Sequence, residues 1–212
     1  MDYKLKVSGE WQADLERGSL LQSTLMPEHR VRLDANNRWR TEEEARDYLR
    51  RLPARCWAVE EPLSVGDYQG CRALYESRVL HIILDESFKE VDEFQFIQET
   101  PAAWIINIRV SKMGGLLRAL AVAAKCNDLG IPIVVGAQVG ETSILSRAAL
   151  AVADRYREAL RAQEGAFGTH LLESDLCHPP VMFGAAGRLD PTAFSGRPGL
   201  GLSFVRDVLG TR

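Results

Sequence analysis

Three acidic residues recur along the chain at a nearly constant spacing. Asp34 in RLDAN, Glu60 in AVEEP and Asp85 in ILDES each end a short apolar run, and they are 26 and then 25 positions apart. A single acidic residue at such a place commonly caps a turn or a helix, but regular repetition favours a shared role. Carboxylates that converge repel one another unless a cation lies between them. Oxygen ligands of this kind suit Mg²⁺.

Basic residues occupy equivalent places in the same pattern. Lys4 and Lys6 lie two positions apart in YKLKV, and therefore on one face of a strand. Arg109 in INIRV follows Asp85 by 24 positions. Beside a bound metal, these three cations would hold a carboxylate substrate and stabilise negative charge that develops on it.

Three further polar residues are candidates for a second layer around such a site or for substrate contact. Asn36 lies two positions after Asp34, and Asn107 lies two positions before Arg109, so each shares a face with a residue named above. Glu141 follows the apolar run IPIVVG and could enter the site from there, with helix capping as the alternative role.

Alternating secondary structure elements must position these residues. Short apolar, β-branched runs predict strands at Tyr3–Val7, Val31–Asp34, Cys56–Glu60, Val79–Asp85, Ile105–Val110 and Ile131–Gly136, with a weaker one at Thr169–Leu172. Amphipathic stretches predict helices at Trp11–Ser23, Thr41–Leu52, Val65–Tyr75, Val91–Thr100, Leu116–Leu129 and Ile144–Ala162. Thr41 before three glutamates predicts a helix start, and Gly130 predicts a helix stop.

This alternation of strands and helices predicts βαβ units and a parallel sheet. Two architectures compete, an open doubly wound sheet and a closed (β/α)8 barrel, and seven strands are one short of the barrel. The polar strand ends favour the barrel, because parallel barrel strands converge on one mouth that holds the active site.

Composition excludes several other classes of protein. The 212 residues fit one domain, and a net charge of −3 with 46% hydrophobic residues suggests neither nucleic acid nor membrane as a partner. No apolar run approaches the roughly 20 residues that span a bilayer, and MDYKLKVSGE lacks a signal-peptide pattern. The cysteines form no CxxC pair, so disulfides and zinc are disfavoured and a reducing cytoplasm is expected.

In combination, these motifs resemble the enolase superfamily, and within it the muconate-lactonizing-enzyme subgroup, which includes o-succinylbenzoate synthases and dipeptide epimerases. YKLKV resembles its K-x-K strand, while LDANNRW, VEEPL and LDES resemble its three metal-ligand strands. INIRVSKMGGL resembles the strand that carries a lysine on the opposite face of the substrate, and GLGLSFV resembles the closing segment. The resemblance covers essentially the whole chain and implies that residues 1–212 form a TIM-type α/β barrel domain.

The resemblance also implies roles for individual residues. Lys6 would be the base that abstracts a proton, and Lys4 would support it electrostatically. Asp34, Glu60 and Asp85 would be the metal ligands. The cofactor would be Mg²⁺, with Mn²⁺ as an alternative.

Two features depart from the family pattern. Arg109 stands where the opposite-face lysine is expected, and arginine stays protonated at any relevant pH, so it is a poor acid or base. The N-terminal capping domain and the first barrel strand are absent, so the chain opens at what would be the second strand. Either the chain is truncated or a partner supplies the rest.

The expected function is Mg²⁺-dependent abstraction of a proton alpha to a carboxylate by a buried Lys6, with an enolate intermediate. Elimination or cycloisomerisation should follow, because Arg109 cannot act as a second base. A racemase or epimerase of amino acid derivatives or dipeptides is the first alternative, and a truncated, non-catalytic metal-binding subunit is the second. The expected partner is a small carboxylate substrate, and assembly into a homo-oligomer is left open.

Overall fold

The computed structural model describes residues 2–53, 55–77, 80–165, 168–181, 188–190, 192–194 and 196–205. The chain divides into two compact units, the first formed by Met1–Asn107 with Asp128–Pro132, and the second by Ile108–Asn127 with Ile133–Arg212. Among the described residues, no helix has the length and apolar character needed to cross a membrane. The cytoplasmic location stays a prediction.

The first unit is built on five parallel strands: β1 (Asp2–Lys6), β2 (Arg30–Asp34), β3 (Cys56–Glu60), β4 (His81–Leu84) and β5 (Trp104–Ile108). Neighbours in the sheet follow sequence order, and the register places Leu33 beside Val59 and Val59 beside Ile82. All five residues of β5 are buried, as expected for a parallel strand covered on both faces. Leu33, Val59 and Ile82 are at most 1% exposed and form the centre of this core.

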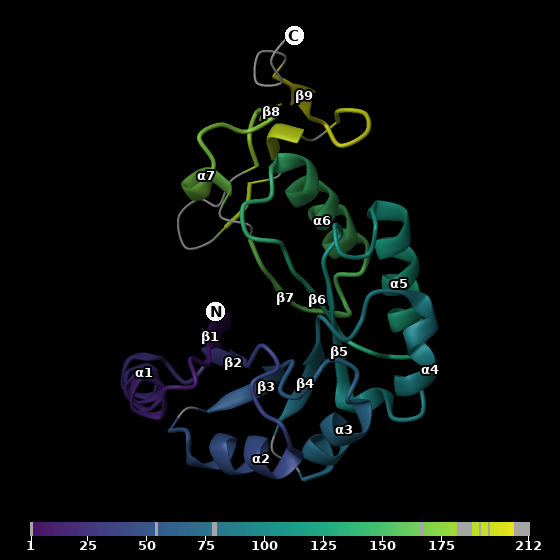
Figure 1. Cartoon of the computed structure of the whole chain (residues 1–212). Helices are drawn as coiled ribbons and strands as arrows, with labels where there is room; N and C mark the ends of the chain where they lie inside the picture. The colour runs from purple at the N-terminus through teal and green to yellow at the C-terminus, as the bar shows by residue number, and fades with distance from the viewer. Residues whose placement is uncertain are drawn as a thin grey trace. The chain divides into compact units, whose positions relative to one another are not determined.

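The helices of the first unit are α1 (Trp11–Thr24), α2 (Glu42–Arg51), α3 (Tyr68–Glu76) and α4 (Phe94–Ile97), with 3₁₀ turns η1 (Val91–Glu93) and η2 (Pro101–Ala103). Figure 1 shows α2 and α3 side by side next to β3 and β4. The Thr41 side chain accepts a hydrogen bond from the Glu44 amide at 3.2 Å, which confirms the predicted start of α2. The predicted helix 91–100 is instead divided between η1 and α4.

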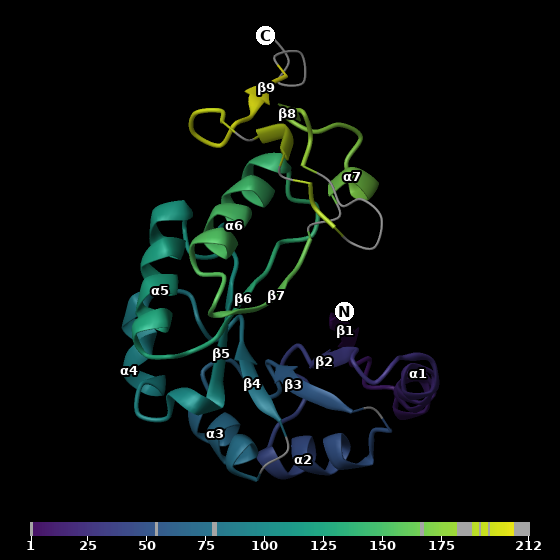
Figure 2. The ribbon, with the colours of Figure 1, turned by 180° about the vertical axis from the view of Figure 1, so that it is seen from behind.

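The second unit contains α5 (Leu116–Asp128), β6 (Ile133–Val135), α6 (Ser143–Arg155), β7 (Leu160–Gln163), the short α7 (Gly168–Leu171), β8 (Cys177–His178), η4 (Thr192–Phe194) and β9 (Ser203–Phe204). Strands β6 and β7 are parallel, with Ile133 beside Leu160, and β8 pairs antiparallel with β9. Helices α5 and α6 lie side by side in both views (Figures 1 and 2). Gly130 follows α5 with φ +67°, which confirms the predicted helix stop.

The strand order decides between the two architectures left open by the sequence. The order runs from β1 to β7 without reversal. A doubly wound sheet needs a switch point at which the strand order reverses. Sequential parallel order is the topology of the predicted TIM-type class, in which each strand is followed by a helix.

The seventh strand is a correction to the sequence prediction. The weaker strand predicted at Thr169–Leu172 is wrong, because α7 covers that segment, and the predicted helix Ile144–Ala162 is too long. Helix α6 ends at Arg155, and Leu160–Gln163 forms β7. This short strand, with sequence LRAQ, lacks the apolar β-branched pattern, so its conformation depends on pairing with β6 rather than on local propensity.

Candidate active site

The three predicted metal ligands stand where three neighbouring strands end. Asp34 is the last residue of β2, Glu60 is the last residue of β3, and Asp85 directly follows β4. The register places Asp34 beside Glu60 and Glu60 beside Ile83. Asp85 lies two positions beyond Ile83 and therefore continues the same face. The three residues are 2%, 1% and 1% exposed, so the strand ends hold three buried acidic side chains.

The two lysines of β1 contact these carboxylates. Lys4 Nζ lies 3.2 Å from Asp34 Oδ2 and 3.2 Å from Glu60 Oε2, so one ammonium bridges two acidic side chains. Lys6 Nζ lies 3.2 Å from the same Asp34 oxygen and donates a hydrogen bond to Asn36 Oδ1 at 2.8 Å. The side chain of Lys4 is 21% exposed, whereas that of Lys6 is 66% exposed. The expected burial of Lys6 is therefore wrong, because β1 ends at this residue and its side chain extends into solvent.

Glu60 is held from three directions. Besides the ammonium of Lys4, its Oε1 accepts a hydrogen bond from Asn107 Nδ2 at 2.9 Å. The guanidinium of Arg32, 4% exposed, approaches its Oε2 at 3.9 Å and also donates to Asp2 Oδ1 at 3.0 Å. Arg32 is not among the residues predicted for this site, although it lies two positions before Asp34 in RLDAN and therefore on the same strand face.

The donor set fits a divalent cation, although no group of three His, Cys, Asp or Glu side chains within the described residues is already arranged around a metal position. The cation that now bridges Asp34 and Glu60 is the ammonium of Lys4. Asp34 Oδ1 is buried and accepts no hydrogen bond. A buried carboxylate oxygen without a donor is costly, and a hard cation satisfies it.

Arg109 and Glu141 belong to the second unit. Arg109 follows β5 directly and its Nη1 donates a hydrogen bond to Gln138 Oε1 at 3.2 Å. Glu141, 8% exposed, accepts hydrogen bonds from Ser111 Oγ and the Gln138 amide, both at 2.9 Å. These contacts join the segments that follow β5 and β6. The structure thus collects the predicted residues in two groups, one in each unit.

The cysteines are poor candidates for chemistry. All four are free, and none of their side chains is exposed. Burial raises the pKa of Cys56, Cys71 and Cys126 to about 12 in each case, with the charge of Glu61 adding to the effect at Cys71. These thiols therefore stay protonated at neutral pH and do not supply a nucleophilic thiolate.

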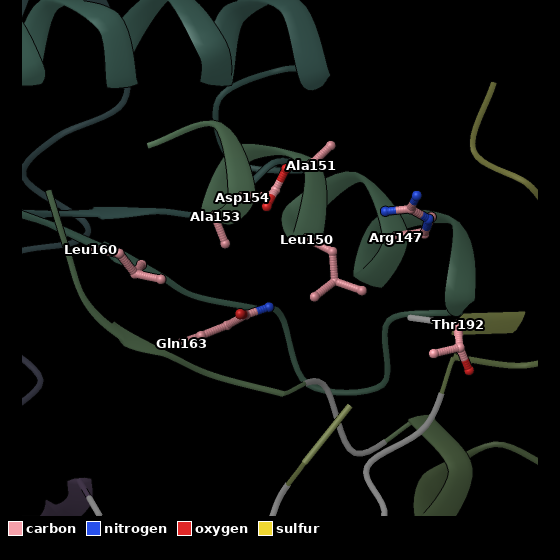
Figure 3. A pocket seen from close by; sticks show the side chains of 8 residues that line it. All are labelled: Arg147, Leu150, Ala151, Ala153, Asp154, Leu160, Gln163 and Thr192. Atoms are coloured by element: carbon pink, nitrogen blue, oxygen red, sulfur yellow. The ribbon is translucent and has the colours of Figure 1, made fainter. Parts of the chain in front are cut away.

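A cavity of about 680 Å³ in the second unit is lined by residues of α6, β7 and η4. Figure 3 shows the side chains of Arg147, Leu150 and Asp154 along α6 and those of Leu160 and Gln163 along β7. Its lining carries charges of both signs and none of the predicted ligands or bases. The candidate site is accordingly defined by the buried charges at the strand ends rather than by cavity size.

Comparison with known proteins gives a match over nearly the whole chain. The sequence model of the family described as enolase C-terminal domain-like matches residues 2–208. A hydrophobic dipeptide epimerase from Enterococcus faecalis is 27% identical over 94% of this chain and 55% of the relative. An o-succinylbenzoate synthase from Thermobifida fusca is 31% identical over 84% of this chain and 55% of the relative. The chain spans about half the length of these relatives.

Solved structures share the fold. The muconate cycloisomerase from Pseudomonas fluorescens has a TM-score of 0.80 at 29% identity, covering 96% of this chain and 55% of the other. A dipeptide epimerase from Cytophaga hutchinsonii, solved in complex with Mg and the dipeptide D-Ala-L-Val, has a TM-score of 0.82 at 23% identity, covering 98% and 55%. Solved proteins with two different activities therefore share one fold with this chain.

Proposed function

Since the chain belongs to the enolase C-terminal domain-like family, we propose that the protein abstracts a proton alpha to a substrate carboxylate and then eliminates a group or cycloisomerises. Membership confirms the predicted family and its α/β, TIM-type fold class. The observation that carries the proposal is the contact of two lysine ammoniums, Lys4 and Lys6, with the buried Asp34 at 3.2 Å each. Such a cluster supplies a base, a fixed cation and acidic ligands within one set of strand ends.

Asp34, Glu60 and Asp85 would hold Mg²⁺, or Mn²⁺ in its place. When bound, the metal withdraws electron density from the substrate carboxylate and so makes the neighbouring C–H bond more acidic. Asn107 donates to Glu60 and thereby orients one ligand. Lys4 remains beside the carboxylates as a fixed positive charge that offsets negative charge on the substrate.

Lys6 would take the proton. The 66% exposure of its side chain leaves it accessible both to water and to a substrate. Asn36 accepts a hydrogen bond from its Nζ at 2.8 Å, which directs the amine. A base must lie within hydrogen-bond reach of the proton that it abstracts, so the orientation of the Lys6 amine matters as much as its charge.

Arg109 would act as a fixed cation rather than a second base. Its guanidinium stays protonated, and its hydrogen bond to Gln138 restrains the side chain. A racemase needs a proton acceptor on each face of the carbon, whereas a one-base elimination or cycloisomerisation needs one. The proposed substrate is a small carboxylate, and cytoplasmic location is part of the same proposal.

The test is hydrogen exchange in D₂O. Full-length protein with Mg²⁺ is incubated with enantiopure N-acylamino acids and dipeptides, and the alpha proton is followed by NMR. We expect exchange in one enantiomer of an accepted substrate, with retention of configuration. Lys6→Ala should slow exchange by about 10²–10⁴-fold, the usual contribution of a general base. The matched control is Lys89→Ala, which removes an exposed lysine of the same unit.

The other outcomes separate the alternatives. Inversion with deuterium incorporated from both enantiomers would identify an epimerase and overturn the one-base proposal. Mg²⁺ binding without exchange in any of a broad carboxylate set would favour a non-catalytic metal-binding subunit. Exchange that survives Lys6→Ala unchanged would remove Lys6 from the proposed role.

A further inference from the structure

Glu61, the residue after the predicted ligand Glu60, has a side chain that neither the family motif nor the charge pattern assigns. It is 1% exposed, and both oxygens of its carboxylate accept hydrogen bonds. Oε1 accepts from the backbone amides of Asp85 at 2.6 Å and Ser87 at 2.8 Å. Oε2 accepts from Ser87 Oγ at 2.8 Å and from Asn37 Nδ2 at 3.1 Å. The two neighbouring glutamates therefore contact different groups.

The four donors belong to two different turns. Asn37 lies in the turn after β2, three positions beyond Asp34, whereas Asp85 and Ser87 lie in the turn after β4. The main-chain ladder still connects this region through the Glu61 amide, which donates to the Ile83 carbonyl at 3.0 Å. The Glu61 carboxylate adds a second connection, because its hydrogen bonds reach donors in both turns.

The contacts continue outward from the carboxylate. Asn37 Nδ2 also donates to the Leu63 carbonyl at 2.6 Å, and Ser87 Oγ accepts from the Gly66 amide at 2.9 Å. The donors on Glu61 are thus themselves fixed. Charge-assisted hydrogen bonds of this kind are about twice as strong as neutral ones, so the carboxylate restrains both turns.

The backbone at Glu61 is strained in a way that supports a specific role. Its φ is +42°, in the left-handed region that residues with a Cβ rarely adopt. Such conformations are unfavourable for a residue with a Cβ and persist where the surroundings determine them. Glycine would relieve this strain but would supply no carboxylate. The strained residue at this position therefore contributes a carboxylate that glycine would lack.

We propose that Glu61 is a positioning residue that sets the backbone of the metal ligand Asp85 relative to the turn that follows Asp34. The inference rests on the proposed function, since it assumes that these carboxylates hold a metal. Two hydrogen bonds hold the amides of Asp85 and Ser87, and the bond to Asn37 ties the β4 turn to the β2 turn. Removing the carboxylate should loosen the ligand set without removing any ligand.

The experiment measures Mn²⁺ affinity by EPR, amide hydrogen exchange at Asp85 and Ser87 by NMR, and thermal unfolding, all on the full-length protein. Glu61→Ala should weaken Mn²⁺ binding by about 10-fold or more, the range found for groups that orient metal ligands, and should speed exchange at both amides. Glu61→Gln keeps one carbonyl oxygen for the two amides and should lose affinity less than Glu61→Ala.

A matched control separates positioning from general loss of stability. Asp67 caps α3 in the same unit by accepting from the Gly70 amide at 2.8 Å. Asp67→Ala should lower the melting temperature while leaving Mn²⁺ affinity and the Asp85 amide unchanged. If Glu61→Ala does not fold, Glu61→Gly carries the test, since glycine adopts φ +42° without strain.

The outcomes distinguish this inference from the proposed function. If the wild-type protein binds no Mn²⁺, both the metal site and the positioning role are overturned. If the wild type binds Mn²⁺ and the variants that lack the carboxylate bind it equally well, only the positioning role is overturned. Equal loss of affinity in Asp67→Ala would likewise overturn it, because the effect would then follow stability alone.

Discussion

The polar groups at the strand ends of the two units are stabilised in different ways. In the first unit, Asp34 and Glu60 are buried against the cations Lys4, Lys6 and Arg32. In the second unit, Glu141 is held by a serine hydroxyl and a backbone amide. Ion pairs in a buried cluster depend on every member, because removing one leaves an uncompensated charge, whereas a carboxylate held by neutral donors leaves only unpaired donors. The first arrangement provides acidic side chains that can accept a further cation, and the second holds a turn in place.

The largest expected loss of stability follows removal of the Glu60 carboxylate. Glu60→Ala should destabilise the metal-free protein by about 3–5 kcal/mol, because Lys4 and the buried Arg32 lose their shared anion. Glu141→Ala in the second unit should cost about 1–2 kcal/mol. Urea unfolding in EDTA measures both. Equal losses would show that the two units do not differ in this respect.

Metal binding should give the next largest change in the free energy of unfolding. At 100 times its dissociation constant, Mn²⁺ or Mg²⁺ should stabilise the wild-type protein by about 2.7 kcal/mol, since it binds the folded state. Asp34→Asn should abolish most of that gain, whereas Asp92→Asn, a change at an exposed acidic residue of the same unit, should keep it. Thermal unfolding with and without metal is the measurement. A gain retained in Asp34→Asn would place the metal elsewhere.

Asp14 is a second buried carboxylate of the first unit, and most of its partners are neutral donors, with the half-exposed Arg17 as a longer ion pair at 3.5 Å. Burial alone would raise its pKa, but hydrogen bonds from Tyr48, Ser8 and Gly9 outweigh burial and lower the pKa below its ordinary value of 3.8. Its stabilising contribution is therefore complete above the ordinary pKa and is lost as the pH falls through the lower folded value.

Asp14→Asn should accordingly cost about 2 kcal/mol at pH 7, the contribution of hydrogen bonds to a charged group. The difference from wild type should be constant above the ordinary pKa of 3.8 and should shrink as the pH falls below it toward the lower folded pKa. Urea unfolding of both proteins between pH 2 and pH 7 tests this, with Asp154→Asn at an exposed position as control. A difference that already disappears near pH 6 would contradict the assignment.

The smallest change in stability is expected at Arg109. Arg109→Lys should cost about 1 kcal/mol or less, because one hydrogen bond to Gln138 is weakened. Its functional effect should be qualitative, since lysine can exchange a proton and arginine cannot. Deuterium should then enter both enantiomers of an accepted substrate in D₂O. Exchange still confined to one enantiomer would show that position 109 does not face the second side of the carbon.

The sequence predicted most of the fold of the first unit because its signals are local. Alternating apolar runs located β1 to β5 to within a few residues, and Cys56–Glu60 was predicted with the observed bounds. Thr41 and its following glutamates located the start of α2, because a capping side chain acts on amides only three residues away. The strand-end acidic residues followed from the same pattern, since each strand ends where its apolar run ends.

Other features depended on pairing between distant segments, which a local pattern does not encode. Strand β7 has no strand-like sequence and exists through its pairing with β6. The two lysines of YKLKV looked equivalent, yet Lys4 bridges two carboxylates and Lys6 is mostly exposed, because only Lys6 stands at the end of β1.

The two neighbouring glutamates of VEEPL show the same difference between what the local sequence specifies and what tertiary contacts specify. The position of an acidic pair at the end of β3 follows from the local pattern, because the apolar run stops there. The contacts of Glu60 with Lys4 and Asn107, and of Glu61, at φ +42°, with the amides after β4, come from long-range packing. The physical reason is that each carboxylate is oriented by donors that lie between 24 and 56 residues away in the chain.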